Sequence, residues 1–239
     1  MSTPTAKGTL YLMPVWLGDH GGVEQLPPEN AIIAARVTLW FAENEKTARR
    51  MLRRMVPEIV LPDLEIHRLD KDSTSADVNT ALSLMDHGRD AGVISEAGMP
   101  GIADPGALMV RAAHRAHMTV VPLIGPSSLF LALAASGLNG QQFTFHGYLP
   151  RTPMERKQFI KKIEGDAQRT NAAQLFIETP YRNDALLADL LQTCASDTLL
   201  TIAVDLTQPG GTVHTHTIGE WNKRKLTMGK RPAVFIIGS

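Results

Sequence analysis

The chain has 239 residues, 44% of them hydrophobic, and its 24 Lys and Arg residues balance 24 Asp and Glu residues. This length is enough for a full hydrophobic core in one large or two small domains. The formal net charge of zero excludes a global electrostatic attraction to nucleic acid or to an anionic membrane, although local basic patches are compatible with it.

The single cysteine, Cys194, excludes an internal disulfide and favours a reducing compartment. It lies within a helical pattern, which favours a small buried hydrophobic role over that of a nucleophile. The longest apolar run, Leu129 to Ala135, is far shorter than the ~20 residues of a membrane helix, and the N-terminus lacks a signal-peptide pattern. We therefore expect a cytoplasmic protein with no membrane attachment.

Patterns typical of strands and helices alternate along the chain. Strands are predicted, in order, at Thr9–Met13, Val37–Phe41, Val93–Ser95, Thr119–Leu123, Phe143–Gly147, Gln174–Glu178, Leu199–Val204, Val213–Ile218 and Ala233–Ile237. Helices are predicted at Glu45–Met55, Ala76–His87, Gly106–Ala116, Ser127–Ser136, Met154–Ile163, Tyr181–Cys194 and Glu220–Leu226. This alternation predicts an α/β fold with a mostly parallel sheet in the N-terminal half.

The C-terminal sheet is expected to be mixed, because its last strands follow one another closely and residues 208–211 read as a turn. Two prolines around a glycine in residues 122–126 indicate a division into domains of residues 1–124 and 125–239. The helix at 127–136 is apolar on nearly every face, so we expect it to be buried where the halves meet, with Gly137 as its C-cap.

Residues 91–106, AGVISEAGMPGIADPG, are the most informative stretch of the chain. A short buried strand ends at Ser95, a glycine-rich loop follows, and Asp104 and Pro105 suit the N-cap and first position of a helix. In open α/β sheets ligands bind at this edge, where loop N–H groups and helix N-termini converge. A short loop that only connects the strand to the helix would account for the helix cap. It would not need the conformational freedom that the glycines give the loop backbone.

The combination of strand, small or polar residue, proline and helix appears three times, at Asp104-Pro105, Gly125-Pro126 and Thr179-Pro180. Helix N-termini carry free N–H groups and partial positive charge, so a cleft lined by them suits a carboxylate or a phosphate. The alternative is that each is an ordinary cap.

Several catalytic motifs are absent from the sequence, including the dinucleotide fingerprint, the P-loop, H-E-x-x-H, paired C-x-x-C and G-x-S-x-G. His214 and His216 share one face of a predicted strand, but two ligands favour an ordinary strand face over a metal site. We expect no metal and no covalent nucleophile.

Motifs spread over almost the whole chain resemble those of the tetrapyrrole methylase superfamily of S-adenosylmethionine-dependent methyltransferases. The resemblance is strongest to the branch that methylates a cytidine ribose 2′-hydroxyl in bacterial small-subunit ribosomal RNA. The segments that carry it are Gly8–Leu12, Ala42–Glu45 with Thr47, Arg49 and Leu52, Ser95–Pro100, Ala103–Gly106, Pro122 with Gly125–Ser127, Phe145–Arg151 and Glu178–Arg182.

The resemblance implies two α/β domains with S-adenosylmethionine in the cleft between them, commonly within a homodimer. The residues that it assigns to the methyl donor are Ala97, Gly98, Met99, Pro100, Ile102, Ala103, Pro126, Ser127, Ser128 and Gly147. The chain departs from the usual family pattern at Asn44, Glu45 and Glu96, so the resemblance carries over the donor site but not the acceptor site.

A ribose hydroxyl is a weak nucleophile, and Glu43, after a predicted strand, is the candidate general base. It could equally be a carboxylate favoured by a helix dipole. Arg49 and Arg53 on one basic helix are candidates for contacts with RNA phosphate, although a solvated helix face explains them too. Tyr181 and Arg182 are candidates for further acceptor contacts, and the alternative for Arg182 is an ion pair with Glu178.

Two other functions are compatible with the same residues. One is C-methylation of a tetrapyrrole or another small molecule. The other is a non-catalytic protein that binds RNA or the ribosome and has lost the donor.

Overall fold

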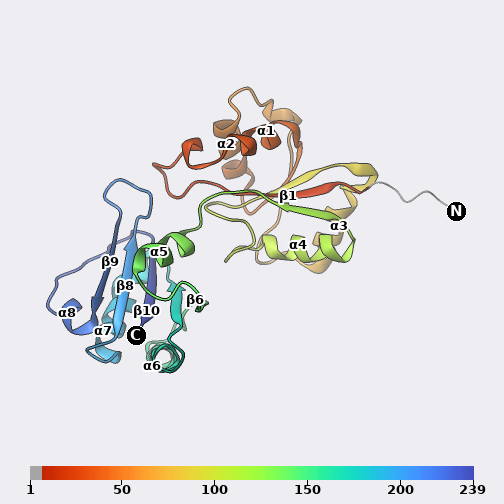
Figure 1. Ribbon diagram of the computed structural model, residues 1–239. Coiled ribbons are helices and arrows are strands. Elements are labelled where there is room, and N and C mark those ends of the chain that lie inside the picture. Colours follow the sequence, from red (N-terminus) through yellow and green to blue (C-terminus); the bar gives the residue numbers. More distant parts are fainter. Residues whose placement is uncertain (1–6) are drawn as a thin grey trace. The chain divides into compact units, whose positions relative to one another are not determined.

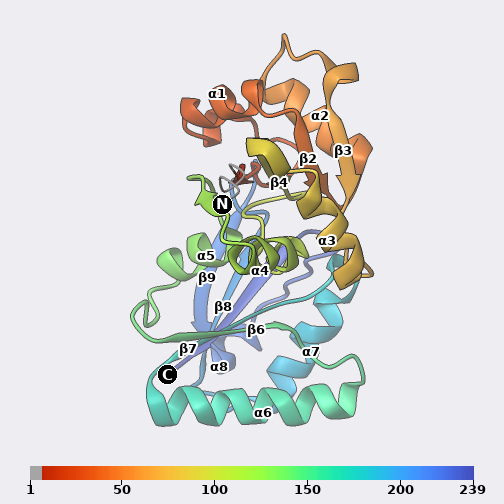
Figure 2. The same cartoon turned by 90° about the vertical axis from the view of Figure 1, so that its right-hand side faces the viewer.

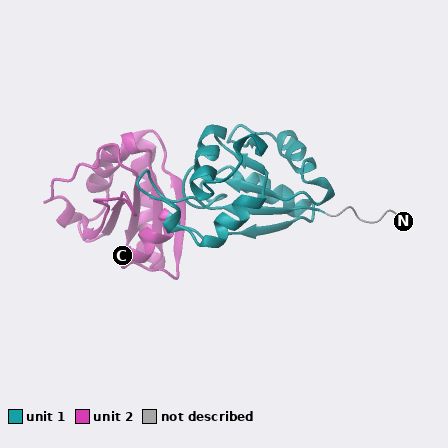
Figure 3. Ribbon diagram, turned by 90° about the horizontal axis from the view of Figure 1, so that it is seen from above, with its two compact units in different colours: residues 1–127 teal, residues 128–239 magenta. Residues whose placement is uncertain are grey.

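A computed structural model describes residues 7–239, which form two compact units (Figure 3). The first unit ends at Ser127, and the second comprises residues 128–239. Each unit has its own five-stranded sheet and its own hydrophobic core.

The sheet of the first unit has the order β3-β2-β4-β1-β5, and all its strand pairs are parallel. The strands are β1 (Thr9–Met13), β2 (Leu39–Ala42), β3 (Glu65–Arg68), β4 (Ala91–Ile94) and β5 (Thr119–Pro122). The expected parallel N-terminal sheet is confirmed. Residues alternate between its faces because successive side chains of a strand point to opposite sides.

Helices cover both faces of this sheet, as the two helix layers in Figure 1 show. On one face α1 (Pro28–Arg36) and α2 (Glu45–Met55) pack against Tyr11, Met13 and Trp40. On the other face α3 (Ser75–Ser83) and α4 (Gly106–Arg115) pack against Leu10, Phe41 and Val93. Short 3₁₀ turns lie at Val23–Gln25, Leu61–Asp63 and Asp86–Gly88.

The sheet of the second unit has the order β6-β7-β10-β8-β9, and Figure 2 labels β6, β7, β8 and β9 of this sheet. Only the β6–β7 pair is parallel, and the other three pairs are antiparallel, so the expected mixed sheet is confirmed. Its strands are β6 (Phe143–Tyr148), β7 (Ala173–Ile177), β8 (Leu199–Val204), β9 (Thr212–Thr217) and β10 (Ala233–Gly238).

One face of this second sheet is covered by α5 (Ser128–Ser136), which packs Leu129, Ala132 and Leu133 against it. The opposite face is covered by α6 (Pro153–Thr170), α7 (Asn183–Thr193) and α8 (Ile218–Trp221), with a 3₁₀ turn at Pro180–Arg182. Phe130, on the side of α5 that faces away from this sheet, is 52% exposed. Gly137 follows α5 with a φ of +74°, as a C-cap requires.

Two elements escape prediction from the sequence, for different reasons. The strand β3 has the sequence Glu-Ile-His-Arg and lies at the edge of its sheet, so it lacks an apolar run. The helix α1 begins at Pro28 after a second proline, a pattern that also reads as a loop. The helix α4 begins at Gly106 as predicted, but its N-cap is Pro105 and not Asp104, although the φ and ψ of Pro105 are already helical.

Candidate functional site

The carboxyl ends of four parallel strands meet at one edge of the first sheet. The register pairs Ala42 of β2 with Ile94 of β4, Met13 of β1 with Ile94, and Leu12 with Pro122 of β5. Glu43 and Ser95, the residues that follow β2 and β4, therefore lie at the same edge. This is the edge at which ligands bind in open α/β sheets.

The loop after β4 has the backbone freedom expected of it. Gly98, Gly101 and Ala103 all have positive φ values, of +70°, +82° and +55°. The Ser95 hydroxyl donates to the carbonyl oxygens of Ala97 and Gly98, at 3.2 and 3.1 Å, and fixes the start of the loop. Glycine suits the first two positions because L-residues with a side chain rarely adopt this conformation.

Part of this loop presents backbone donors that the protein does not use. Within residues 7–239, the N–H groups of Met99 and Ala103 have no hydrogen-bond acceptor, whereas the N–H of Gly98 donates to the Val15 carbonyl at 3.0 Å. The loop also approaches the segment after β5, because a Cβ on Gly98 would lie 3.5 Å from the Pro126 carbonyl oxygen. Two of the predicted donor residues, Gly98 and Pro126, thus lie close together.

Asp104 closes the loop through its side chain. Its Oδ1 accepts the N–H of Gly101 at 3.0 Å and the N–H of Gly106 at 2.7 Å, so one carboxyl oxygen ties the loop to the first turn of α4. Asp104 was predicted as the N-cap of this helix, but the N-cap is Pro105, and Asp104 instead holds Gly101 of the loop and Gly106, the first residue of the helix, through its carboxylate.

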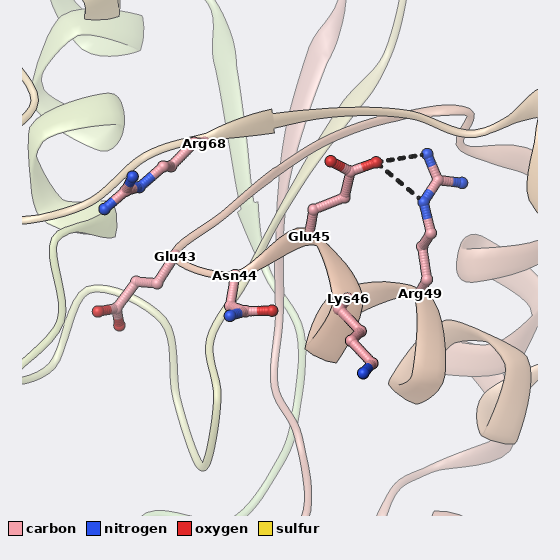
Figure 4. A pocket seen from close by; sticks show the side chains of 6 residues that line it. All are labelled: Glu43, Asn44, Glu45, Lys46, Arg49 and Arg68. Carbon is pink, nitrogen blue, oxygen red and sulfur yellow. Dashed lines mark hydrogen bonds and ion pairs between the residues drawn. The ribbon is translucent and has the colours of Figure 1, made fainter.

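Glu43 is half-buried and borders a hollow at the start of α2 (Figure 4). The lining residues are Glu43, Asn44, Glu45, Lys46, Arg49 and Arg68. Burial is the main cause that raises the pKa of Glu43, and the negative charges of Asp104, Glu96 and Asp70 raise it further, together with a side-chain hydrogen bond to Asp104. A carboxylate with a raised pKa is a better general base near neutral pH than an ordinary surface glutamate.

The basic side chains of α2 differ in how far the protein already uses them. Arg49 donates to Glu45 and to the carbonyl oxygens of Leu61 and Leu64, so its guanidinium holds α2 to the following segment. Arg53 is exposed and donates only to the Pro57 carbonyl, at 3.2 Å. Lys46 is exposed and has no ion-pair partner among the described residues.

The remaining predicted site residues lie in the second unit. Gly147 has a φ of +66°, in a stretch where the register between β6 and β7 shifts. Tyr181 is 72% exposed and lies beside the Arg182 guanidinium. Arg182 donates through Nε to the buried carboxylate of Glu178 at 3.0 Å, so the pairing anticipated as the alternative is present.

The described residues contain neither a metal-binding cluster nor a membrane-spanning helix. Across residues 7–239, no group of three or more His, Cys, Asp or Glu side chains is arranged to hold a metal ion. The rings of His214 and His216 are stacked, with their centroids 6.1 Å apart. No helix in the same range is both long and apolar enough to cross a membrane.

Residues 21–222 match the family described as tetrapyrrole (corrin/porphyrin) methylases, and the chain belongs to this family. It is therefore a methyltransferase.

Two relatives illustrate the similarity in sequence. A protein of Xylella fastidiosa named ribosomal RNA small subunit methyltransferase I is 33% identical over 87% of this chain and 71% of its own length. A protein of the same name from Escherichia coli O157:H7 is 28% identical over 99% of this chain and 79% of its own length.

The fold agrees with solved structures of the family. The methyltransferase CobJ has a TM-score of 0.64 at 19% identity and covers 98% of this chain and 95% of its own. A uroporphyrin-III-C-methyltransferase from Thermus thermophilus has a TM-score of 0.55 at 18% identity and covers 97% of this chain and 92% of its own.

One residue that lines the hollow, Arg68, was not predicted, because it lies on the unpredicted strand β3. Lys46, which also lines the hollow, lies on the basic helix that carries the predicted candidates Arg49 and Arg53.

Proposed function

We propose that this methyltransferase uses S-adenosylmethionine and methylates a ribose 2′-hydroxyl of small-subunit ribosomal RNA. The observation that carries the proposal is the loop from Ala97 to Ala103, whose free amides lie at the same sheet edge as Glu43. The relatives named ribosomal RNA small subunit methyltransferase I support RNA as the acceptor.

The residues of the loop fit the methionine end of the donor. A carboxylate accepts hydrogen bonds from backbone amides such as those of Met99 and Ala103, and the positive φ values keep side chains away from such an approach. The Ser127 and Ser128 hydroxyls have no hydrogen-bond partner within residues 7–239 and offer further donors. When bound, S-adenosylmethionine supplies an electrophilic methyl group on a sulfonium.

The protein contributes alignment and a proton acceptor. In the transfer the carbon–sulfur bond breaks as the bond from the ribose oxygen to carbon forms, and the hydroxyl proton passes to Glu43 and then to solvent. Holding both reactants in line can contribute roughly 7–11 kcal/mol, which suits a site without a covalent nucleophile. A base contributes a further factor of about 10²–10⁴.

The acceptor is proposed to contact the exposed cations of α2. Arg49 and Arg53 stay candidates for phosphate, together with Lys46, which lines the same hollow as Glu43 and Arg49. Tyr181 and Arg182 stay candidates for acceptor contacts from the second unit. We further infer a cytoplasmic enzyme that acts as a homodimer, as the family resemblance implies.

The direct test offers methyl-labelled S-adenosylmethionine together with three classes of acceptor: assembled small ribosomal subunits, free RNA and a tetrapyrrole. We expect label in ribosomal RNA, recovered as a 2′-O-methylnucleoside after digestion. Label in the tetrapyrrole alone would contradict the proposal, as would calorimetry that finds no heat at millimolar donor.

A further inference from the structure

The segment that joins α8 to β10 concentrates positive charge in a chain whose net charge is zero. Residues 222–232, which we call the basic segment, contain five of the 24 Lys and Arg residues of the chain, and residues 221–239 contain no Asp or Glu. The five cations are Lys223, Arg224, Lys225, Lys230 and Arg231. Such a local excess of positive charge attracts anions, although the chain as a whole does not.

The strand register shows that the basic segment runs along the whole length of β8. Thr217, the last residue before α8, pairs with Leu199 at the start of β8. Ala233, the first residue of β10, pairs with Val204 at the end of β8. The segment therefore crosses from one end of this six-residue strand to the other, a span of roughly 20 Å. Figure 1 shows it as a long arc between α8 and β10.

The protein holds the basic segment in place through its apolar side chains and its backbone. Met228 is buried, and Leu226 packs against the same core cluster, on the face of the sheet that α6 and α7 cover. The Met228 N–H donates to Asp184 at 2.8 Å, and the Asn183 side chain donates to the Arg231 carbonyl at 2.7 Å. A segment that is already fixed loses less conformational entropy when it binds a ligand.

Most cations of the basic segment are available to an anion. Four of the five are exposed and form no ion pair within residues 7–239: Lys223, Arg224, Lys225 and Lys230. The fifth, Arg231, lies 3.7 Å from the Asp205 carboxylate. The neighbouring carboxylate of Glu220 already accepts the Thr217 N–H at 2.9 Å. A row of unpaired cations matches the regularly spaced negative charges of a sugar-phosphate backbone.

We propose that the basic segment is an RNA-binding surface of the second unit, which holds phosphates of the acceptor RNA other than those of the reacting nucleotide. This inference rests on the proposed function, which makes the acceptor an RNA. The segment ends beside the acceptor residues proposed in this unit, because Arg231 is bonded to Asn183, the residue after Arg182. Tyr181 is 72% exposed and offers its ring to an unstacked base.

An anionic membrane surface is the other partner that such a charge could attract, and the apolar side chains argue against it. Stable attachment to a membrane combines a basic patch with exposed apolar side chains or a lipid chain. The large apolar side chains of the basic segment, Leu226 and Met228, pack toward the core instead. The segment therefore presents charge without an apolar anchor, which fits RNA better.

The test removes three exposed charges of the basic segment whose side chains make no hydrogen bond or ion pair within residues 7–239. This variant combines Lys223→Gln, Lys225→Gln and Lys230→Gln. The matched control removes three exposed charges elsewhere and has the same net charge. It combines Arg111→Gln, Arg115→Gln and Lys162→Gln.

Fluorescence anisotropy with a short labelled single-stranded RNA measures binding across a salt series, without S-adenosylmethionine. We expect the variant of the basic segment to bind at least about tenfold more weakly at low salt. Its plot of log affinity against log salt should flatten by about two units, since each contact with a single strand contributes about 0.7. The control should keep the wild-type affinity and slope.

Wild-type affinity and slope in the variant of the basic segment would overturn the proposal. An equal loss in the control would also overturn it, because the effect would then be one of net charge. Wild-type protein that binds vesicles of phosphatidylserine and phosphatidylcholine, but no RNA, would assign the segment to membranes and overturn it as well.

The binding assay involves no methyl transfer, so it is separate from the test of the proposed function. RNA binding that depends on the basic segment, without methylation of any ribose, would contradict the proposed function but not the RNA-binding role of the segment. Methylation of ribosomal RNA with the wild-type KM in the variant would support the proposed function and overturn the role of the segment.

Discussion

Val15 and Gly98 exchange two backbone hydrogen bonds, one of 2.9 Å from the Val15 N–H and one of 3.0 Å from the Gly98 N–H. This isolated bridge joins the segment after β1 to the loop after β4. The bridge fixes Gly98 in a conformation with positive φ. Because it uses the Gly98 N–H, the N–H groups left free for a ligand belong to other residues of the loop. Gly98 is thus a structural anchor of the loop, and its own N–H is not available to a ligand.

The substitution Gly98→Val should abolish donor binding. A β-branched residue is strained at a φ of +70°, and beyond its Cβ, which would already touch Leu17 Cδ2 at 3.4 Å, its γ-methyl groups would occupy the space beside the loop backbone. The matched control is Gly137→Val, which has a similar φ of +74° and no neighbour within 4 Å of the added Cβ. Both variants should lose about 1–3 kcal/mol of unfolding free energy. Calorimetric titration should show lost donor binding only for Gly98→Val; equal affinity in both would contradict the site.

Reversing two exposed charges on α2, with Lys46→Glu and Arg53→Glu together, should weaken RNA binding in a salt-dependent way. Each lost phosphate contact should flatten the plot of log affinity against log salt by about one unit, so we expect a change of about two. We leave Arg49 intact because its bonds to Leu61 and Leu64 support the fold.

The control for this pair is Arg111→Glu with Arg115→Glu, two exposed cations of α4 with the spacing of one helical turn. This control should bind RNA with the wild-type salt slope. If both double variants lose the same affinity, the effect is one of net charge and α2 is not the RNA-binding surface.

Cys194 should be inert to thiol reagents in the native state. Burial is the main cause that raises its pKa to about 12, and the charge of Glu164 adds to it, so almost no thiolate exists at neutral pH. We expect alkylation by iodoacetamide at pH 8 to be ~100-fold slower in the native protein than in denaturant. Similar rates in the two states would show that the thiol is exposed.

Glu164 should make the stability of the second unit depend on acid pH. Burial alone would raise its pKa, but hydrogen bonds from Lys161, Thr198 and the Ala195 N–H outweigh burial and lower it. A lowered pKa in the folded state stabilises the fold above the unfolded value, near 4.5, and this stabilisation is lost as the pH falls through the folded value.

The variant Glu164→Gln should therefore lose about 2 kcal/mol of unfolding free energy at pH 7, and the difference from wild type should shrink at acid pH. Urea denaturation at several pH values measures this. The exposed Glu155→Gln, on the same helix, should stay within about 0.5 kcal/mol of wild type. A difference that does not change with pH would contradict the ionic role of Glu164.

Much of the fold could be predicted because its hydrophobic periodicity is local. The strands β1 and β8 and the helix α2 begin and end where the sequence predicted. The polar edge strand β3 could not be predicted, since only its neighbour β2 makes it a strand. The site was predictable in part for the same reason. The bonds of Asp104 to the loop are local, but the placement of Glu43 at the same edge as Ser95 depends on the sheet order, which no local pattern encodes.

The central claim is that the methyl donor is held by backbone amides of the loop after β4. Hydrogen–deuterium exchange with and without saturating S-adenosylmethionine tests it most directly, because it reports on those amides themselves. We predict slower exchange in residues 97–103, with the amides of Met99 and Ala103 most affected. Exchange that the donor leaves unchanged in this loop, or slows only elsewhere in the chain, would contradict the account.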